Sequence, residues 1–185
     1  MSYDLYCYKS KIGRPDLGEA QTALEETDDA NTDSNSSNFD LKEKLAKVLV
    51  DFNPKLERFI FDYNEIAKMQ NITIEQARKT FQHIELTKAE GELAVQLTIY
   101  DGNVSITVPY WYSGEKAKAV FKEVSEYTKL IKQKAGYFVY DPQTENVYDP
   151  CVGEFDGLDI YERTTIETQK LSTQKTTTKP WWKFS

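Results

Sequence analysis

Apolar and polar residues alternate strictly along the centre of the chain. The alternation runs through Ile84–Leu86, then through Leu93–Ile99, and then through Val104–Val108. A period of two is the pattern of a strand that is buried on one face. Asp101-Gly102 separates the last two runs, and this dipeptide is typical of a β-hairpin turn. The pattern therefore predicts a three-stranded antiparallel meander with one apolar face.

A helical pattern follows the meander. Over Glu115–Lys134 the apolar residues recur every three or four positions, so they form one stripe on a helix. The stripe is sized to cover the apolar face of the predicted sheet. Gly136 is placed to end this helix as a left-handed C-cap. Further strands are predicted at residues 3–9 and 137–140, and a hairpin turns the second of them back into residues 147–148.

The N-terminal part has weaker periodicity. We expect a short helix around residues 16–26. The segment from about residue 27 to 38 is nearly all Asp, Asn, Ser and Thr, which predicts a flexible acidic loop. Asp40 is predicted to cap a helix that continues through Leu49.

The region before the meander is ambiguous. Residues 59–63 (Phe-Ile-Phe-Asp-Tyr) fit either a strand or a buried turn. Two short helices are predicted after them, at 64–70 and 73–81. Thr73 followed by Gln76 has the spacing of a capping box, which marks the start of the second helix.

Together these elements predict an α+β fold. We expect one antiparallel sheet of four to six strands that includes the meander, with helices packed mainly on one face. Residues 1–164 would form this domain, and residues 165–185, rich in Thr and Lys, would form a flexible tail. The tail ends in an aromatic cluster of Trp181, Trp182 and Phe184. We expect this cluster to dock on the domain or on a partner, while weak membrane contact is a second interpretation.

Charge and cysteine content narrow the class of protein. The 185 residues carry a formal net charge of −7, which argues against a general nucleic-acid binder and suits a basic partner. Cys7 and Cys151 are too few for a disulfide framework or a zinc site, so two reduced thiols are expected. The N-terminus has no signal-peptide pattern and no stretch approaches a membrane-spanning run, so we expect a cytoplasmic protein.

The sequence carries no recognisable catalytic motif. His83 is the only histidine, and no nucleophile elbow, metalloprotease motif or Gly-rich phosphate loop accompanies it. We therefore predict no catalytic residue, no metal and no cofactor, and we interpret His83 as a structural or surface residue.

Candidate partner-binding residues lie in two segments. Tyr110, Trp111 and Tyr112 follow the last meander strand and are of the type that anchors interfaces, although they could instead close the core. From Asp141 to Glu162, seven acids occur without a Lys or Arg. This segment could form solvated turns, meet a basic partner or bind a divalent cation. The acidic candidates for partner contact are Asp141, Asp149, Glu154, Asp156, Asp159 and Glu162.

Three stretches look familiar. They are the opening Met1–Lys9 (Met-Ser-Tyr-Asp-Leu-Tyr-Cys-Tyr-Lys), the strand end Ile106–Trp111 and the hairpin Gly136–Thr144. In these stretches the chain resembles a mostly uncharacterised family of small bacterial proteins, which is similar to the immunity proteins of polymorphic toxin systems. The resemblance covers roughly residues 1–10 and 80–150. It implies a cytoplasmic, non-enzymatic protein that binds and neutralises a cognate toxin, and it brings no catalytic residue onto this chain.

Two other functions stay open at this point. A small enzyme could build a site from Asp, Glu and Tyr side chains, or a cation could bind the acidic segment; either requires a polar cleft beside Asp141 or Glu154. A membrane-associated accessory protein could be held by its aromatic C-terminal cluster. The sequence leaves the oligomeric state open.

Overall fold

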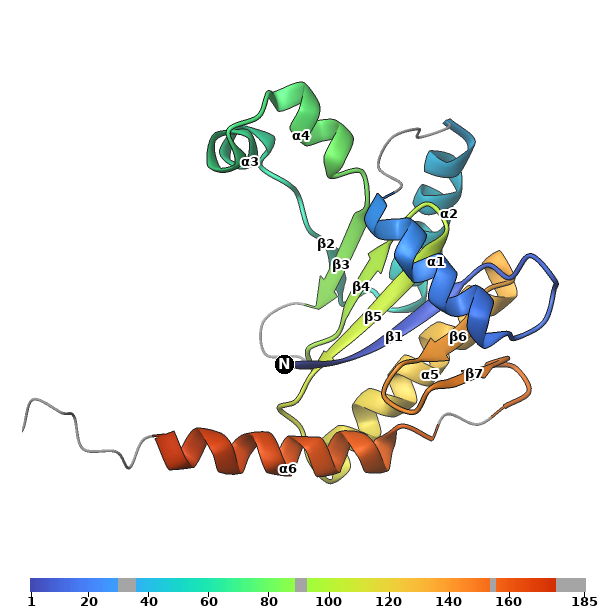
Figure 1. Ribbon diagram of the computed structural model, residues 1–185, viewed down its shortest axis with the longest axis vertical. Coiled ribbons are helices and arrows are strands. Elements are labelled where there is room, and N and C mark those ends of the chain that lie inside the picture. Colours follow the sequence, from blue (N-terminus) through green and yellow to red (C-terminus); the bar gives the residue numbers. More distant parts are fainter. Residues whose placement is uncertain (30–35, 89–92, 154–155, 176–185) are drawn as a thin grey trace, which may run out of the picture.

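The centre of the fold is a seven-stranded antiparallel sheet with the order β2-β3-β4-β5-β1-β6-β7 (Figure 1). The computed structural model describes residues 1–29, 36–88, 93–153 and 156–175. The strands are β1 (Ser2–Tyr8), β2 (Leu56–Arg58), β3 (Ile84–Lys88), β4 (Gln96–Ile99), β5 (Asn103–Pro109), β6 (Phe138–Asp141) and β7 (Asn146–Tyr148). The described residues also form the helices α1 (Leu17–Asp29), α2 (Ser36–Phe52), α3 (Tyr63–Gln70), α4 (Ile74–Thr80), α5 (Glu115–Ala135) and α6 (Leu158–Lys175).

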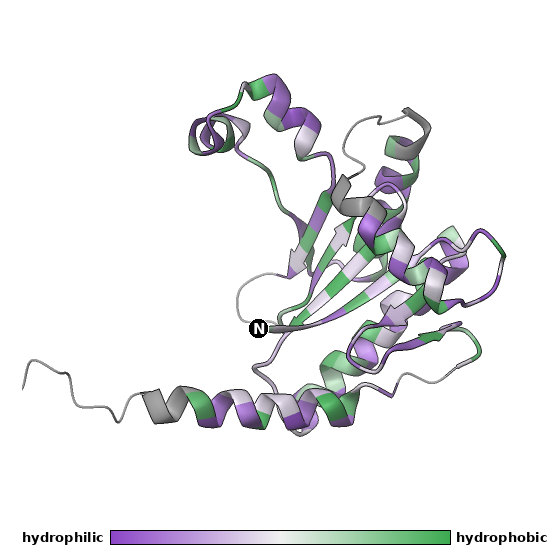
Figure 2. Cartoon of the chain, viewed as in Figure 1, coloured by the Kyte–Doolittle hydropathy of each residue, from purple (hydrophilic) through white to green (hydrophobic). Residues whose placement is uncertain are grey.

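The predicted meander is confirmed as β3-β4-β5. Its register sets apolar residues opposite one another, so that Leu86 lies across from Leu97 and Leu97 lies across from Ile106. All three side chains are buried on the same face. The first strand of the chain, β1, joins the far side of β5 and also pairs with β6, so it lies inside the sheet. Figure 2 shows the alternation as bands of hydropathy along the central strands.

Helices cover the two faces of the sheet unequally. The apolar face carries the main core, which α2 and α5 complete and to which α6 adds Tyr161. On the opposite face, Ala20 of α1 packs with Tyr8, Phe138 and Tyr140 in a smaller cluster. Figure 1 shows α1 crossing in front of the sheet while α2 and α5 lie behind it. The expected α+β class and the packing of helices mainly on one face agree with this arrangement.

A helical hairpin, α3–α4, stands beside the β2–β3 end of the sheet (Figure 1). Asp62 caps α3 by accepting from the backbone N–H groups of Asn64 and Glu65. The predicted capping box at Thr73 and Gln76 is confirmed at the start of α4. Only Ala67 and Ala77 are buried within the two helices, so the hairpin is held mainly through its ends and its connections.

The sheet has one strand more than the upper end of the predicted range. The additional strand, β2, is an edge strand of three residues that pairs with β3. Three residues are too few to show a period of two, and the strand begins only a short turn after α2 ends at Phe52. The ambiguous residues 59–62 continue from it as an extended connection, in which the Phe59 N–H donates to the Glu85 carbonyl over 2.9 Å.

The boundaries of two helices also differ from the predictions. Helix α2 begins at Ser36 rather than after Asp40, so the acidic segment predicted as a loop contributes to helices at both of its ends. Its middle, 30–35, lies outside the described residues. Helix α6 runs to Lys175, so the predicted tail is helical from residue 165 to 175. Thr165 is fully buried one helical turn after Tyr161, and a sequence pattern that counts Thr as polar hides that packed stripe.

Candidate functional site

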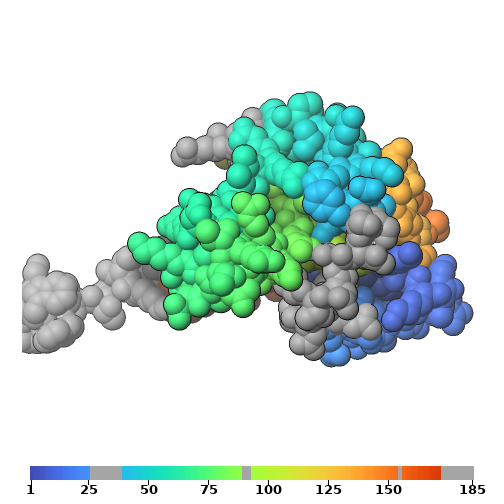
Figure 3. Space-filling model, turned by 90° about the horizontal axis from the view of Figure 1, so that it is seen from above, coloured from blue at the N-terminus to red at the C-terminus, as the bar shows by residue number. Residues whose placement is uncertain are grey.

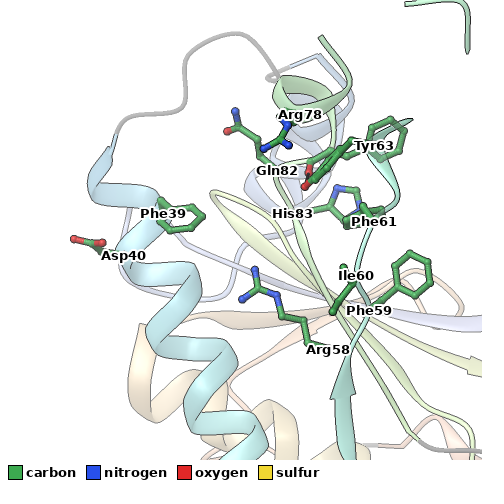
Figure 4. A pocket seen from close by; sticks show the side chains of 11 residues that line it. Phe39, Asp40, Arg58, Phe59, Ile60, Phe61, Tyr63, Arg78, Gln82 and His83 are labelled. Atoms are coloured by element: carbon green, nitrogen blue, oxygen red, sulfur yellow. Dashed lines mark hydrogen bonds between the residues drawn. The ribbon is translucent and has the colours of Figure 1, made fainter. Parts of the chain in front are cut away.

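A cleft of about 580 Å³ opens between the first turns of α2, the connection after β2 and the α3–α4 hairpin. Seen from above in Figure 3, the surface is hollowed between the hairpin and α2. Figure 4 shows how the side chains around this cleft lie. The lining residues are Phe39, Asp40, Arg58, Phe59, Ile60, Phe61, Tyr63, Arg78, Phe81, Gln82 and His83.

Aromatic rings form the wall of the cleft. The ring of Phe61 lies at the centre, with its centroid 5.2 Å from that of Phe59, 5.7 Å from that of Phe81 and 4.9 Å from that of His83. The contacts to Phe59 and His83 are edge-to-face, the geometry that aromatic pairs prefer. Phe59, Phe61, Tyr63, Phe81 and His83 are called the Phe61 cluster below. Packing of these rings holds the connection after β2 in place, beyond the point where β2 stops pairing with β3.

His83 is held within the cleft wall. Its Nε2 lies 3.0 Å from the Glu85 Oε1, and its ring lies 5.3 Å from that of Tyr100. Glu85 lies in β3, two residues after His83, and Tyr100 directly follows the end of β4. These contacts orient the imidazole as part of the wall.

A buried lysine ties the elements around the cleft together. Lys42 of α2 pairs with Asp101 at 2.5 Å, and its Nζ donates to the Gln82 carbonyl over 3.1 Å. The lysine side chain is almost fully buried, so the ion pair and the hydrogen bond compensate for its desolvation. The start of α2, the β4–β5 turn and the end of the hairpin are thereby joined at one point.

Two arginines lie on either side of the His83 ring in Figure 4. Arg58 donates from Nη1 to the Glu43 Oε2 over 2.8 Å, in an exposed pair. The guanidinium of Arg78 lies over the Tyr63 ring, 5.3 Å from its centroid. Within the described part of the chain, no carboxylate comes within ion-pairing distance of Arg78. The cleft thus combines aromatic surface with two guanidinium groups.

Large apolar side chains around the cleft are exposed. Ile60 is 85% exposed, and Phe59 and Phe39 are about half exposed. Phe39 points from α2 toward the cleft (Figure 4). Apolar surface that is rimmed by charged groups is typical of an interaction site on a soluble protein.

The aromatic residues predicted to bind a partner are mostly part of the core. Tyr110 is buried and its ring stacks on that of Tyr161 at 5.2 Å. The Tyr112 hydroxyl accepts from the Ala94 N–H. Trp111 alone among the three is well exposed. The alternative interpretation, that this segment closes the core, therefore fits Tyr110 and Tyr112.

Several of the predicted acidic residues stabilise turns. Asp141 is buried and accepts hydrogen bonds from the Tyr3 hydroxyl and from the Gln143 N–H. Asp149 accepts from the Cys151 N–H over 2.9 Å and pairs with Lys132 at 3.2 Å.

The other acidic candidates differ in their exposure. Glu162 accepts from the Gly114 N–H over 2.8 Å, at the start of α5. Asp156 and Asp159 are exposed. Glu154 lies outside the described residues, as do Trp181, Trp182 and Phe184 of the predicted docking cluster. The described candidates therefore do not form one continuous exposed set.

A small polar cavity of about 200 Å³ lies beside Asp141, where the enzyme interpretation requires a polar cleft. Burial, and then the hydrogen bond to Asp141, raise the pKa of Tyr3 far above its ordinary value, so this hydroxyl stays protonated at neutral pH. No cluster of His, Cys, Asp or Glu in the described ranges is arranged to hold a metal ion. The contacts of Asp141 give its carboxylate a structural role.

The arginines and phenylalanines of the cleft were missed in the sequence. Their local signal is the run Arg58-Phe59-Ile60-Phe61-Asp62, a short apolar stretch between charged residues. It shows neither the two-residue period of a strand nor the 3.6-residue period of a helix. Such a run predicts an irregular apolar connection, and its pairing with Phe39, Arg78 and Phe81 depends on contacts between distant segments.

Comparison with known proteins gives no relative. No family model matches the chain, and no curated protein or solved structure is significantly similar to it. The resemblance to immunity proteins therefore stays a prediction. Among the described helices, none combines the length and the apolar character that crossing a bilayer requires.

Proposed function

We propose that this chain is a non-enzymatic protein-binding module and that the cleft and the α3–α4 hairpin contact the partner. The observation that carries the proposal is the exposure of Phe39, Phe59 and Ile60 around an aromatic and arginine-lined cleft. Aromatic residues and arginine in a central pocket supply most of the binding energy in many protein interfaces.

The α3–α4 hairpin beside the cleft exposes further apolar side chains. Met69 on α3 is 79% exposed, and Ile74 at the start of α4 is also exposed. A small molecule seated in the cleft would leave these residues in water, whereas a protein partner could cover them together with the cleft. The extent of the surface therefore favours a macromolecular partner.

An immunity role is the more specific form of this proposal: the chain would bind and neutralise a cognate bacterial toxin. It is supported by the lack of a catalytic motif in the sequence and by the resemblance of the N-terminal strand and the 136–144 hairpin to a small bacterial family that is similar to immunity proteins. An immunity protein acts by covering its target, so a cleft with exposed apolar residues suits the task.

The test is affinity capture from the native host with the tagged full-length chain, followed by mass spectrometry. Three proteins are compared: wild type, Ile60→Asp in the cleft and Val152→Asp as a matched control. Val152 is 87% exposed and lies away from the cleft lining, so both variants add one charge to an exposed apolar position. We expect wild type and Val152→Asp to capture one stoichiometric partner, and Ile60→Asp to lose it at least tenfold.

Capture of the same partner by Ile60→Asp would show that the cleft is not the binding site. A monodisperse wild-type protein that captures no partner would oppose the binding function itself. The immunity role is tested by expressing the captured partner alone and together with this chain. Growth arrest that co-expression relieves supports the role, and arrest that persists would rule it out.

A further inference from the structure

We propose that the cleft recognises an acidic peptide segment of the partner, in which Arg78 binds a carboxylate and an adjacent large apolar side chain packs on the Phe61 cluster. This inference rests on the proposed protein-binding function and adds the chemistry of the partner.

The first argument is the sign of the local charge. The whole chain carries a net charge of −7, yet the cleft is lined by Arg58 and Arg78. The one carboxylate among the lining residues, that of Asp40, points away from the other side chains (Figure 4). Among the lining residues the two guanidinium groups outnumber the one carboxylate, and an acidic group is the ligand that complements them.

The second argument is the state of the two arginines. Arg58 already pairs with Glu43, but both partners are exposed, and such pairs contribute little and exchange readily. The guanidinium carbon of Arg78 lies over the Tyr63 ring, 5.3 Å from its centroid. A guanidinium has five N–H donors, and a pair of them can donate two parallel hydrogen bonds to a carboxylate. Arg78 is thus the better candidate to bind an incoming acid.

The third argument is the apolar surface beside the arginines. A carboxylate alone would not cover Phe59 and Ile60, which stay exposed in the unbound chain. The cleft volume of about 580 Å³ lies within the usual range for ligand pockets and takes one or two large side chains rather than a whole element. An acidic residue next to a large apolar residue satisfies both parts of the site.

Peptide is favoured over nucleic acid as the source of the acidic group. A polynucleotide would meet the repulsion of the net negative chain, and two arginines neutralise only a short part of its backbone. An acidic side chain on a protein, by contrast, brings a single negative charge to the Arg78 guanidinium. Oligothymidylate is included in the test to check this choice.

The experiment uses the full-length, isotope-labelled protein and small probes that imitate the proposed contact. The probes are 3-phenylpropionate, which carries a ring and a carboxylate, and 3-phenylpropanamide, which has the same shape without the charge. Binding is followed through amide chemical shifts at low ionic strength. We expect the acid to shift signals of Phe61, Arg78 and His83, and to bind about fivefold more tightly than the amide.

Two variants assign the difference to Arg78. Arg78→Gln should lower the affinity for the acid to that of the amide, because it removes the charge and keeps a polar side chain. Arg163→Gln removes an exposed arginine of α6 and should leave the preference unchanged. Equal binding of acid and amide to wild type, or shifts confined to another surface, would overturn the inference.

The captured partner separates this inference from the proposed function. If Ile60→Asp loses the partner and Arg78→Gln also weakens it about fivefold or more, both proposals are supported. If Ile60→Asp loses the partner and Arg78→Gln binds as wild type does, the binding function stands and carboxylate recognition is wrong. Arg78-dependent binding of oligothymidylate in preference to the phenylpropionate probe would replace the peptide by a nucleic acid.

Discussion

Two aromatic clusters lie in different parts of this molecule, and only one of them is closed. Tyr3, Tyr110, Phe121 and Tyr161 form the closed one, called the Tyr161 cluster, with ring centroids 4.8 to 6.4 Å apart. The Phe61 cluster has similar spacings and similar edge-to-face contacts. The rings of the Tyr161 cluster are buried, whereas Phe59 in the Phe61 cluster is half exposed.

The difference lies in what covers the rings. Helices α5 and α6 pack on the Tyr161 cluster, and its hydroxyl groups have partners: Tyr161 donates to the Pro109 carbonyl over 2.6 Å and Tyr3 donates to Asp141. The α3–α4 hairpin covers the Phe61 cluster only in part. Aromatic packing by itself therefore does not indicate function. Exposed aromatic residues beside charged groups are typical of interaction sites.

Truncation of a closed ring should have the largest effect on stability. Tyr161→Ala removes a fully buried ring and its two backbone hydrogen bonds, and we expect it to lower the free energy of unfolding by about 3–5 kcal/mol. Phe59→Ala in the open cluster should change it by about 1 kcal/mol or less. Urea unfolding compares the two variants. Equal losses would show that the Phe61 cluster is part of the core.

Removal of one hydroxyl group should also cost more stability in the Tyr161 cluster than in the Phe61 cluster. Tyr3→Phe leaves the buried Asp141 carboxylate without its tyrosine donor, and we expect a loss of about 1–3 kcal/mol in unfolding free energy. Tyr63→Phe is the matched change in the open cluster. Its hydroxyl donates to the Phe81 carbonyl over 3.3 Å at a half-buried position, so the expected loss is below about 0.5 kcal/mol. A Tyr3→Phe protein as stable as wild type would contradict a stabilising role for the Tyr3–Asp141 contact.

Alkaline pH should weaken the closed parts of the fold. Burial raises the pKa of Tyr3 and of Tyr127 far above the ordinary value of 10.0. Below that value the tyrosines are protonated in both the folded and the unfolded chain, so stability is unaffected. Above it the unfolded chain releases protons that the folded chain keeps, and stability falls by about 1.4 kcal/mol per pH unit for each such tyrosine.

Urea unfolding at a series of pH values from neutral to alkaline measures this loss. Tyr127→Phe should reduce the fall of the unfolding free energy with pH by about 1.4 kcal/mol per pH unit, because that side chain is fully buried. A stability that stays constant as the unfolded tyrosines ionise would contradict the raised pKa values.

Loss of the α4 cap should give the smallest and most local effect. Thr73→Ala removes the capping box, which is worth about 1 kcal/mol to the helix. The hairpin buries little of its own surface, so we expect faster hydrogen exchange in α4 with little change in the central strands. Equal acceleration in β4 and β5 would mean that the hairpin unfolds together with the core.

Local pattern was sufficient for the middle of the chain. The meander, the α5 stripe and its end at Gly136 follow from the spacing of apolar residues and from one left-handed glycine with φ 76°. The three-residue strand β2 and the helical continuation through Thr165 could not be predicted in the same way. Strand β2 is too short to show the alternation of apolar and polar residues that marks a strand. The continuation of α6 buries Thr165, which a hydropathy pattern counts as polar.

Sequence by itself determined which residues of each strand and helix share a face, because that depends only on the geometry of the local backbone. Tertiary structure decided which element covers each face. It set β1 between β5 and β6, placed α1 on the opposite face from α5, and buried Tyr110 and Asp141. It also brought Phe39, Phe61 and Arg78 to one cleft. Burial of a side chain depends on contacts between segments far apart in the chain, and a local pattern carries no record of these contacts.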